Sequence, residues 1–364
     1  MDFDAIVIGG SAVGGAAAAS CARNGLSTAI LEEDKHVGKY KRCTAICSEH
    51  GLKSTKIPYQ NAILNKVKGA IIHSPNSTAE VSMKKDRGIV FDRQQFDENS
   101  IDRAVYYGAE LYKEHRAISF RHFSYNNYSV FAGKTFNSSS ILGADGVASH
   151  TAHAFHFPRL NNVAYCYERE VTNVDVPYTD LVYVFIDNEN LPGFFGWSVP
   201  VDKRTVRIGF GTTDLPQLMK AKRFFFSQDA LSFAKSKKAK ILRKFNAAIP
   251  LGPRKKTQNG NVLLIGDAAG QTKATTGGGL IFGSLCAEIA GQSLHEHLNL
   301  EKKLNYERRW RKEYGKTLEA HRKVRKTFDR LPNKALDISV SALSLPTVNS
   351  AISKFGDMDY ILKF

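Results

Sequence analysis

The order of apolar and polar positions predicts that the chain begins with a β-α-β unit. A short apolar run at residues 3–8 is followed by a segment of small residues at 14–24 and by a second apolar run at 27–31. Short apolar runs bounded by glycine are typical of buried strands, and the small-residue segment between them is typical of a packed helix. This order indicates an α/β fold with a parallel sheet.

The rest of the chain is predicted to continue as helices and strands without an internal repeat. We expect a helix at 93–108, strands near 109–120 and 127–143, and a strand-rich region from about 160 to 212. Long basic helices are expected at 215–245 and 301–330, and a last helix precedes the terminal sequence FGDMDYILKF.

Composition narrows the classes of protein and partner. The chain has 364 residues, 43% of them hydrophobic, which is enough for two interleaved or tandem domains. Lys and Arg outnumber Asp and Glu by 51 to 35, so the formal charge is +16. This excess favours an anionic partner such as nucleic acid, an anionic membrane surface or a phosphorylated substrate.

Cysteine content and hydropathy bear on the compartment. The five cysteines are odd in number and lack the dense, even spacing of a secreted disulfide framework, which favours a reducing interior. The sequence MDFDAIVIGG lacks the pattern of a signal peptide, and the apolar run at 277–291 is too short and is interrupted by Glu288. We therefore expect a cytoplasmic protein without a transmembrane helix.

The segment VIGGSAVGGAAAA fits the dinucleotide-binding pattern G-x-G-x-x-G at Gly9 and Gly14, with Ser11 at the middle position. A strand precedes it, an Ala-rich helix follows, and the next strand ends in Glu32. Such glycines let a pyrophosphate approach the backbone, while a carboxylate at the end of the second strand accepts the ribose hydroxyls. A tight strand-to-helix turn without a ligand is the alternative.

A second glycine-rich segment, GDAAGQTKATTGGGLIFG at 266–283, follows the apolar run at 262–265. It resembles the flavoprotein segment in which a strand ends in Gly-Asp and the aspartate binds the ribityl chain. Gly277, Gly278 and Gly279 would then lie against the flavin ring, where only bare backbone can come close. The alternative is a mobile glycine-rich loop.

Two intervening segments complete a known pattern. They are VFDRQQFDENSIDRAVYYGAEL, which contains Arg93 and Asp97, and LGADGVASH, which contains Asp145. With them the sequence resembles the flavin-dependent group that includes aromatic-ring hydroxylases and geranylgeranyl reductases. No arginine follows DGVAS, where hydroxylases usually carry one, and this favours the reductases.

Four segments are similar to archaeal geranylgeranyl reductases in particular. KRCTAICSEHG resembles their cysteine loop, and PGFFGWSVP at 192–200 resembles their motif P-x-x-Y-x-W-x-F-P. QTKATTGGG and the terminal KFGDMDY are also similar. The chain departs from the family at Ser11, Ala274 and Val199 and at residues 44–46, which leaves the exact substrate open.

The resemblance implies FAD as cofactor and the saturation of isolated double bonds in polyprenyl chains, such as those of archaeal ether lipids. It implies catalytic roles for Cys43, Cys47, Phe195 and Trp197, and substrate contacts from Phe195, Trp197 and Pro200. The implied FAD contacts are Gly9, Ser11, Val13, Gly14, Glu32, Arg42, Cys43, Thr44, Ile46, Arg93, Ala117, Asp145, Asp267, Gly278, Gly279 and Leu280.

The resemblance also implies the architecture. A discontinuous Rossmann-type FAD-binding domain, formed by residues 1–75, 90–155 and 255–300, would be interleaved with an antiparallel-sheet substrate domain. The substrate domain would comprise 76–89 and 156–254, and a C-terminal helical region would span 301–364.

An unconjugated alkene has no carbonyl to accept charge, so hydride transfer from reduced FAD must accompany or follow protonation of the other carbon. Phe195 and Trp197 are suited to stabilise the resulting cationic carbon by roughly 0.5 to 2 kcal/mol, and their alternative role is ordinary core packing. The electron donor stays open among ferredoxin, a deazaflavin and NAD(P)H, since no second dinucleotide motif is present.

Three interpretations of Cys43 and Cys47 remain. One cysteine contacts the flavin beside a bystander, or the two form a redox pair, or both are buried packing residues. We expect no metal, because the chain has no second cysteine or histidine pair with zinc-ligand spacing, and His150 and His153 are expected at the surface.

The basic charge is concentrated in two segments. Residues 215–256 contain twelve Lys or Arg and one acidic residue, and their basic positions alternate with phenylalanines. The alternatives are a solvated face and an amphipathic surface that docks on an anionic membrane. If the substrate is a lipid, the membrane-docking alternative predicts that the protein attaches peripherally at the inner face of the cell membrane.

Two rival functions differ from the reductase. An FAD monooxygenase on a small hydrophobic substrate is compatible with both nucleotide motifs. A nucleic-acid-binding protein is suggested only by the charge, and no RNA- or DNA-binding motif supports it, so we expect no nucleic-acid partner.

Overall fold

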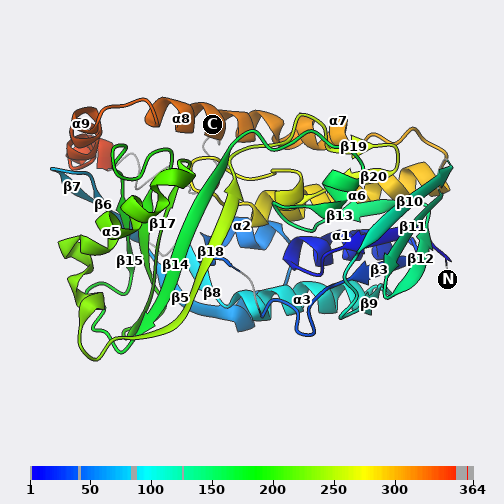
Figure 1. The fold of residues 1–364 in the computed structure, drawn as a ribbon, viewed down its shortest axis with the longest axis horizontal. Helices are drawn as coiled ribbons and strands as arrows, with labels where there is room; N and C mark the ends of the chain where they lie inside the picture. Colours follow the sequence, from blue (N-terminus) through cyan, green and yellow to red (C-terminus); the bar gives the residue numbers. More distant parts are fainter. Residues whose placement is uncertain (1, 40–41, 83–87, 125–126, 350–358, 360–364) are drawn as a thin grey trace.

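The computed structural model describes residues 2–39, 42–82, 88–124, 127–349 and 359, and it contains two large β-sheets (Figure 1). The first is six-stranded, in the order β19-β20-β13-β2-β3-β9. All its neighbouring strands are parallel except β19 and β20. The strands are β2 (Ala5–Ile8), β3 (Thr28–Leu31), β9 (Glu110–Tyr112), β13 (Ile141–Gly143), β19 (Gln258–Asn259) and β20 (Val262–Leu264).

Three helices cover one face of this sheet. The helix α1 (Ala12–Arg23) packs between α3 (Arg93–Tyr106) and α6 (Leu280–Asn299). Its alanines at positions 16–19 are fully buried, because the close approach of three helices leaves no room for larger side chains. The β-α-β unit and the helix predicted at 93–108 are therefore confirmed.

A smaller sheet of four strands, in the order β1-β12-β11-β10, covers the opposite face. Its strands are β1 (Asp2–Phe3), β10 (Ser119–Ser124), β11 (Asn127–Ala132) and β12 (Lys134–Ser138). Tyr128, Val130 and Phe136 pack against the outward-facing apolar residues of the parallel sheet. The parallel sheet is thus buried on both faces, as its short apolar strands predict.

The second large sheet has seven strands, in the order β18-β14-β17-β16-β15-β6-β7, and is antiparallel except for the pair β15 and β6. It stands at the left of Figure 1, with α5 (Leu218–Ser227) on its outer face. Its strands are β6 (Gly69–His73), β7 (Thr78–Ser82), β14 (Val163–Thr172), β15 (Leu181–Phe185), β16 (Gly196–Pro200), β17 (Thr205–Thr212) and β18 (Lys240–Pro250).

The helix predicted at 215–245 is wrong over its second half. Helical structure ends with the turn η3 (Asp229–Lys235), and Lys240–Pro250 form strand β18. This strand pairs with β14 from Val163 to Thr172, so a ten-residue ladder of hydrogen bonds replaces the helix. The alternation of Phe245, Ala247 and Ile249 on one face has the period of a strand, and tertiary pairing decided between the two periodicities.

The remaining elements join the two bodies. The three-stranded sheet β4-β8-β5 lies between them, and the C-terminal helices run along the top of Figure 1. These elements are β4 (Ile46–Ser48), α2 (Glu49–Ser54), β5 (Ile63–Val67), β8 (Gly88–Phe91), α7 (Tyr306–Trp310), α8 (Lys316–Phe328) and α9 (Asn333–Leu343). The expected class, a Rossmann-type α/β body interleaved with an antiparallel-sheet body and followed by helices, is confirmed.

The first predicted domain boundary, between residues 75 and 76, separates β6 from β7. These strands pair with each other, and both belong to the seven-stranded sheet. The part of the chain that joins this sheet therefore begins at Gly69, before the predicted boundary.

Within the part of the chain that the structure describes, no helix has the length and apolar character needed to cross a bilayer.

Candidate functional site

A cavity of about 330 Å³ lies where the two bodies meet. One wall comes from the carboxyl ends of the parallel strands β2, β13 and β20, and the other from the inner face of the seven-stranded sheet. Ligands of open α/β sheets bind at the carboxyl ends of the strands. The position therefore agrees with a nucleotide-type site that also opens onto a second surface.

The first glycine segment forms a tight turn between β2 and α1. Gly9 has φ +100°, and a Cβ on Gly14 would collide with the carbonyl oxygen of Gly9. No described side chain caps the N-terminus of α1, so its N–H groups keep their capacity to bind an anion. Glu32, at the end of β3, accepts hydrogen bonds from the backbone N–H groups of Gly10 (2.6 Å) and Asp34 (2.9 Å). Its carboxylate thereby fixes the loop beside the turn.

The second glycine segment lines the cavity directly. Gly277 has φ +73°, and its N–H donates to the carbonyl of Lys273 (2.8 Å), which closes a compact loop before α6. Gly279 begins α6, and a Cβ there would lie 2.6 Å from Oδ1 of Asp267. Asp267 is exposed at the cavity wall. Bare backbone, a helix N-terminus and a carboxylate therefore meet at one place.

The opposite wall is mainly apolar. Val182 and Val184 on β15, like Trp197 and Val199 on β16, are alternate residues, so strand alternation directs them to the cavity. Phe195 stacks on Phe194 with a 4.4 Å centroid separation, and it meets Trp197 edge to face at 5.7 Å. The sheet residues that line the cavity are Cys166, Glu168, Val182, Tyr183, Val184, Trp197, Val199, Phe245, Ala247, Ala248 and Ile249.

The predicted cysteine loop lies between these walls. Cys43 is partly buried and lines the cavity, and its Sγ accepts a hydrogen bond from the N–H of Ala45 (3.3 Å). Cys47 lies on β4 and is buried, and burial raises the pKa of its thiol far above the ordinary value. Both thiols are free, and a thiol that stays protonated is a poor nucleophile for disulfide exchange.

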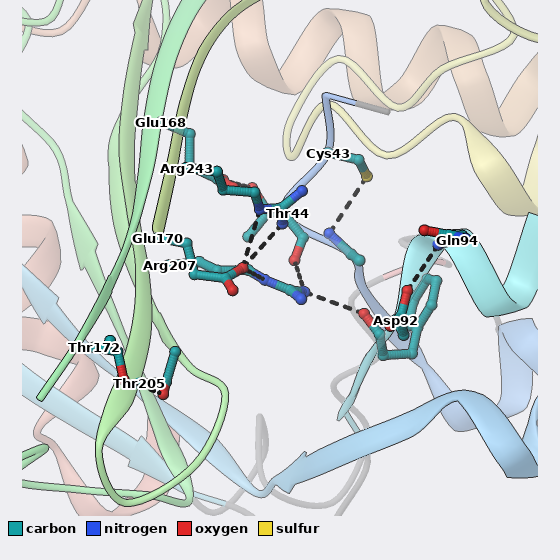
Figure 2. A network of polar contacts seen from close by, with 12 residues as sticks. Cys43, Thr44, Asp92, Gln94, Glu168, Glu170, Thr172, Thr205, Arg207 and Arg243 are labelled. Atoms are coloured by element: carbon teal, nitrogen blue, oxygen red, sulfur yellow. Dashed lines mark hydrogen bonds and ion pairs between the residues drawn. The ribbon is translucent and has the colours of Figure 1, made fainter. Parts of the chain in front are cut away.

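Arg207 anchors the cysteine loop from the seven-stranded sheet. Its guanidinium donates to the carbonyls of Thr44 (2.8 Å) and Phe91 (3.1 Å) and forms an ion pair with Glu170 (2.8 Å). Figure 2 shows this side chain reaching from β17 to the loop and to the strand end before α3. Arg93, at the start of α3, pairs with Asp97 (2.9 Å) and also lines the cavity.

The structure brings together most of the residues singled out in the sequence. Those that line the cavity are Ser11, Val13, Arg42, Cys43, Thr44, Ile46, Cys47, Arg93, Phe195, Trp197, Asp267, Gly278, Gly279 and Leu280. Gly9, Gly14 and Glu32 form the adjoining turn and strand end.

Two predicted FAD contacts, Asp145 and Ala117, are not among the described residues that line the cavity, although Ala144 and Gly146 on either side of Asp145 do line it. Asp145 accepts hydrogen bonds from the Ser149 hydroxyl (2.6 Å) and the Thr151 N–H (2.8 Å), so its carboxylate orders the start of α4 (His150–Ala154). Ala117 is buried, and its carbonyl lies 3.2 Å from Nδ1 of His150.

Pro200 is not among the described residues that line the cavity, in contrast to our prediction. Phe195, Trp197 and Val199 occupy alternate positions, so the period of two in β16 directs Pro200 to the other face. Its carbonyl instead accepts a hydrogen bond from the Asn65 amide (3.0 Å).

Sequence reasoning missed three charged residues of the site: Glu168, Arg207 and Lys273. A charged residue on the buried face of a strand is unusual, so the alternation in YCYERE around Glu168 carried a signal. Lys273 forms a buried ion pair with Asp359, the only described residue of the terminal segment KFGDMDY; the rest of that segment lies outside the described residues. Asp359 also accepts a hydrogen bond from the N–H of Ser48 (2.9 Å), at the end of the cysteine loop.

No three His, Cys, Asp or Glu side chains are grouped in a way that would hold a metal ion, as far as the described ranges extend. His150 and His153 lie on the short helix α4 outside the cavity.

Comparison with known proteins places this geometry in context. No family model matches the chain. It is 31% identical to an uncharacterized protein of Methanocaldococcus jannaschii over 98% of this chain and 92% of that protein. It is 30% identical to the digeranylgeranylglycerophospholipid reductase of the same organism, over 97% of this chain and 93% of that protein. It is 28% identical to the digeranylgeranylglycerophospholipid reductase 2 of Methanopyrus kandleri, over 94% of this chain and 91% of that protein.

Solved structures share the fold. A geranylgeranyl bacteriochlorophyll reductase-like protein from Thermoplasma acidophilum superposes with a TM-score of 0.84 at 19% identity, over 97% of this chain and 96% of that one. A flavin-dependent brominase superposes with a TM-score of 0.77 at 12% identity, over 97% and 93%. At these identities the likeness shows that the fold is one found among flavin-dependent enzymes.

Proposed function

Since the chain belongs to the family of archaeal digeranylgeranylglycerophospholipid reductases, we propose that it is a flavin-dependent reductase that saturates double bonds in the geranylgeranyl chains of a lipid. The observation that carries this function is a cavity in which a nucleotide-type wall faces an apolar, aromatic wall. A soluble aromatic substrate would not need an apolar surface that extends over four strands. The family relation and the geometry therefore lead to the same reaction class.

The residues at the nucleotide-type wall fit FAD. The uncapped N-terminus of α1 and the turn at Gly9 and Gly14 are suited to the pyrophosphate, and Glu32 to the adenosine ribose. Asp267 and Gly277–Gly279 line the cavity, which suits the aspartate to the ribityl hydroxyls and the bare glycine backbone to a flat ring. When bound and reduced, FAD would supply a hydride to the alkene.

The chain's other residues bind and orient the substrate. Val182, Val184 and Val199 offer an apolar surface for the polyprenyl tail, and the faces of Phe195 and Trp197 favour a cationic carbon. Cys43 and Cys47 both line the cavity, but Cys43 is only partly buried, whereas Cys47 is buried and its thiol pKa is raised, so we assign flavin or substrate contact to Cys43 and packing to Cys47. Pro200 is left out of this assignment.

The function is tested by incubating the chemically reduced, flavin-loaded protein with a geranylgeranyl lipid under anaerobic conditions. We expect a mass gain of two hydrogens for each double bond that is reduced. Oxygen-dependent gain of an oxygen atom, with no saturation in its absence, would contradict the reductase and favour a monooxygenase. Failure of the purified protein to retain any flavin would contradict both.

A basic surface beside the apolar wall is suited to docking on an anionic membrane. Apolar side chains are exposed at the start of β18, with Leu242 at 53% and Ile241 at 46% of their full exposure. Exposed lysines lie beside them in the sequence at positions 237, 238 and 240. Apolar side chains inserted among basic ones are typical of interfacial attachment, and a lipid substrate gives this surface a use.

Reversal of Lys237, Lys238 and Lys240 to glutamate should weaken association with anionic vesicles at least tenfold, because each basic residue near such a surface contributes about 1 kcal/mol. Lys235 is left in place, since its ammonium donates to the carbonyls of Ser227 and Gln228. Vesicle sedimentation measures the change. Binding of the wild type should also fall as salt shortens the Debye length from about 10 Å at 0.1 M to about 3 Å at 1 M.

The matched control reverses Lys303, Lys312 and Lys316, which are exposed lysines of the other basic segment. It changes the net charge by the same amount. If both triple variants lose vesicle binding equally, net charge rather than this surface governs attachment, and if the first variant sediments as well as the wild type, the docking surface is wrong.

A further inference from the structure

A buried glutamate on the apolar wall has no role in the assignments above. Glu168 is 1% exposed, lies on β14 and lines the cavity. One carboxyl oxygen, Oε2, accepts hydrogen bonds from the Thr44 hydroxyl and from the indole N–H of Trp197 (2.9 Å). The other, Oε1, is buried and has no hydrogen-bond partner among the described residues.

An unpartnered oxygen is costly for a carboxylate but not for a carboxylic acid. Burying an ionised carboxyl group without full solvation is unfavourable, so the group binds a proton instead. Burial accordingly raises the pKa of Glu168, while the hydrogen bonds from Thr44 and Trp197 and the charges of Arg207 and Arg243 oppose this rise. Both arginines are neutralised in part by Glu170, with which each forms an ion pair.

Side chains from three strands and from the cysteine loop surround Glu168. Arg207 on β17, Arg243 on β18 and Glu170 on β14 are the charged groups nearby, and Cys166 on β14 is the titratable neighbour. Thr44 comes from the cysteine loop and Trp197 from β16. Figure 2 shows Glu168 and Thr44 above the ion pair of Arg207 and Glu170.

The other acids of the cavity are less suited to protonate an alkene. The described lining residues include two carboxyl groups, and Asp267 is exposed on the nucleotide-type wall. Burial raises the pKa of the Cys47 thiol and of the Tyr183 phenol above values that are already high. An unconjugated double bond is a weak base, and the strongest acid in contact with the apolar wall is therefore Glu168.

We propose that Glu168 is the proton donor for alkene reduction, an assignment that rests on the proposed reductase function. The O–H bond of Glu168 breaks and its proton forms a C–H bond at one alkene carbon, using the π electrons. A hydride from the two-electron-reduced flavin forms the second C–H bond, and the flavin is thereby oxidised. The carboxylate that remains stabilises the cationic carbon, and it regains a proton from water before the next turnover.

Trp197 acts as a positioning residue in this scheme. Its indole N–H holds Oε2, which leaves Oε1 as the oxygen that carries the proton. The aromatic motif of the sequence therefore has a second use besides its apolar surface, because the same ring that lines the cavity also orients the acid.

The test compares the wild type with Glu168→Gln, which keeps the shape and the ability to accept from Trp197 but cannot donate a proton from oxygen. Infrared spectroscopy of the flavin-loaded protein in the resting state should show the carbonyl band of a protonated carboxylic acid in the wild type and its loss in Glu168→Gln. Single-turnover reduction of a geranylgeranyl lipid should slow by about 10²- to 10⁴-fold with little change in substrate affinity. Glu168→Asp should recover part of the rate.

The pH dependence of the reduction rate tests the assignment independently. A donor must be protonated, so the rate should be highest at low pH and fall as the pH rises through the pKa of Glu168. Trp197→Phe removes a hydrogen bond that favours the carboxylate, so it should move the infrared titration of this band to higher pH. A role in packing alone would leave the titration of the band in place.

Three results would overturn the assignment. They are a resting wild type without the acid band, a band that persists in Glu168→Gln, and a Glu168→Gln protein that saturates the lipid within threefold of the wild-type rate while the wild type is active. If the wild type binds flavin yet saturates no polyprenyl lipid, the proposed function itself fails, and the proton assignment falls with it.

Discussion

Replacing Asp267 or Glu32 by alanine should weaken FAD binding on the order of 10- to 100-fold, because each change removes charge-assisted hydrogen bonds of roughly 1.5 to 3 kcal/mol. The two residues act at different ends of the cofactor. Asp267 is exposed beside Gly279 at the cavity, whereas Glu32 is buried at the end of β3 and also fixes the N–H of Gly10. We therefore expect Glu32→Ala to affect stability as well as binding.

Titration of the flavin-free protein with FAD, followed by flavin fluorescence, measures both effects. Glu33→Ala is the matched control, since Glu33 is the neighbouring carboxylate but is 59% exposed and lies 3.5 Å from Arg116 at the surface. FAD affinity should be unchanged in the control. Wild-type affinity in both Asp267→Ala and Glu32→Ala would show that the cofactor does not bind in the assigned place.

Replacing Arg207 by methionine should lower the free energy of unfolding by about 3 kcal/mol, because it leaves two backbone carbonyls unpaired in the interior and breaks a buried ion pair. The carbonyls belong to Thr44 and Phe91, so the cysteine loop loses its anchor on the seven-stranded sheet. Alkene reduction should fall at least tenfold with it, since Thr44 also contacts Glu168. Denaturant unfolding at saturating FAD gives the stability change.

Arg243→Met is the matched control for Arg207→Met. Arg243 pairs with the same carboxylate, Glu170, at 3.0 Å, but its side chain is 35% exposed. Exposed ion pairs contribute about 0 to 1 kcal/mol, so the control should lose no more than that. Equal losses in the two variants would mean that the ion pair with Glu170, rather than the carbonyls of the cysteine loop, accounts for the effect of Arg207.

Asp267 could be predicted from the sequence and Arg207 could not, because only Asp267 stands in a local pattern. Asp267 follows an apolar run and precedes a run of glycines, which is a local pattern. Arg207 lies in an alternating strand segment, TVRIGFGT, and its partners Thr44 and Phe91 are more than a hundred residues away in the sequence. Nothing near Arg207 in the chain indicates which carbonyls it will meet.

The sequence by itself determined the β-α-β unit, the two glycine segments and the aromatic motif, because each depends on backbone conformation or periodicity over a few neighbouring residues. Tertiary structure decided two other points. It made a strand of Lys240–Pro250 by pairing it with β14, and it placed Thr44 against Glu168. Long-range pairing and burial set these outcomes, and above all the proton affinity of Glu168, which depends on contacts that form only when the two bodies pack together.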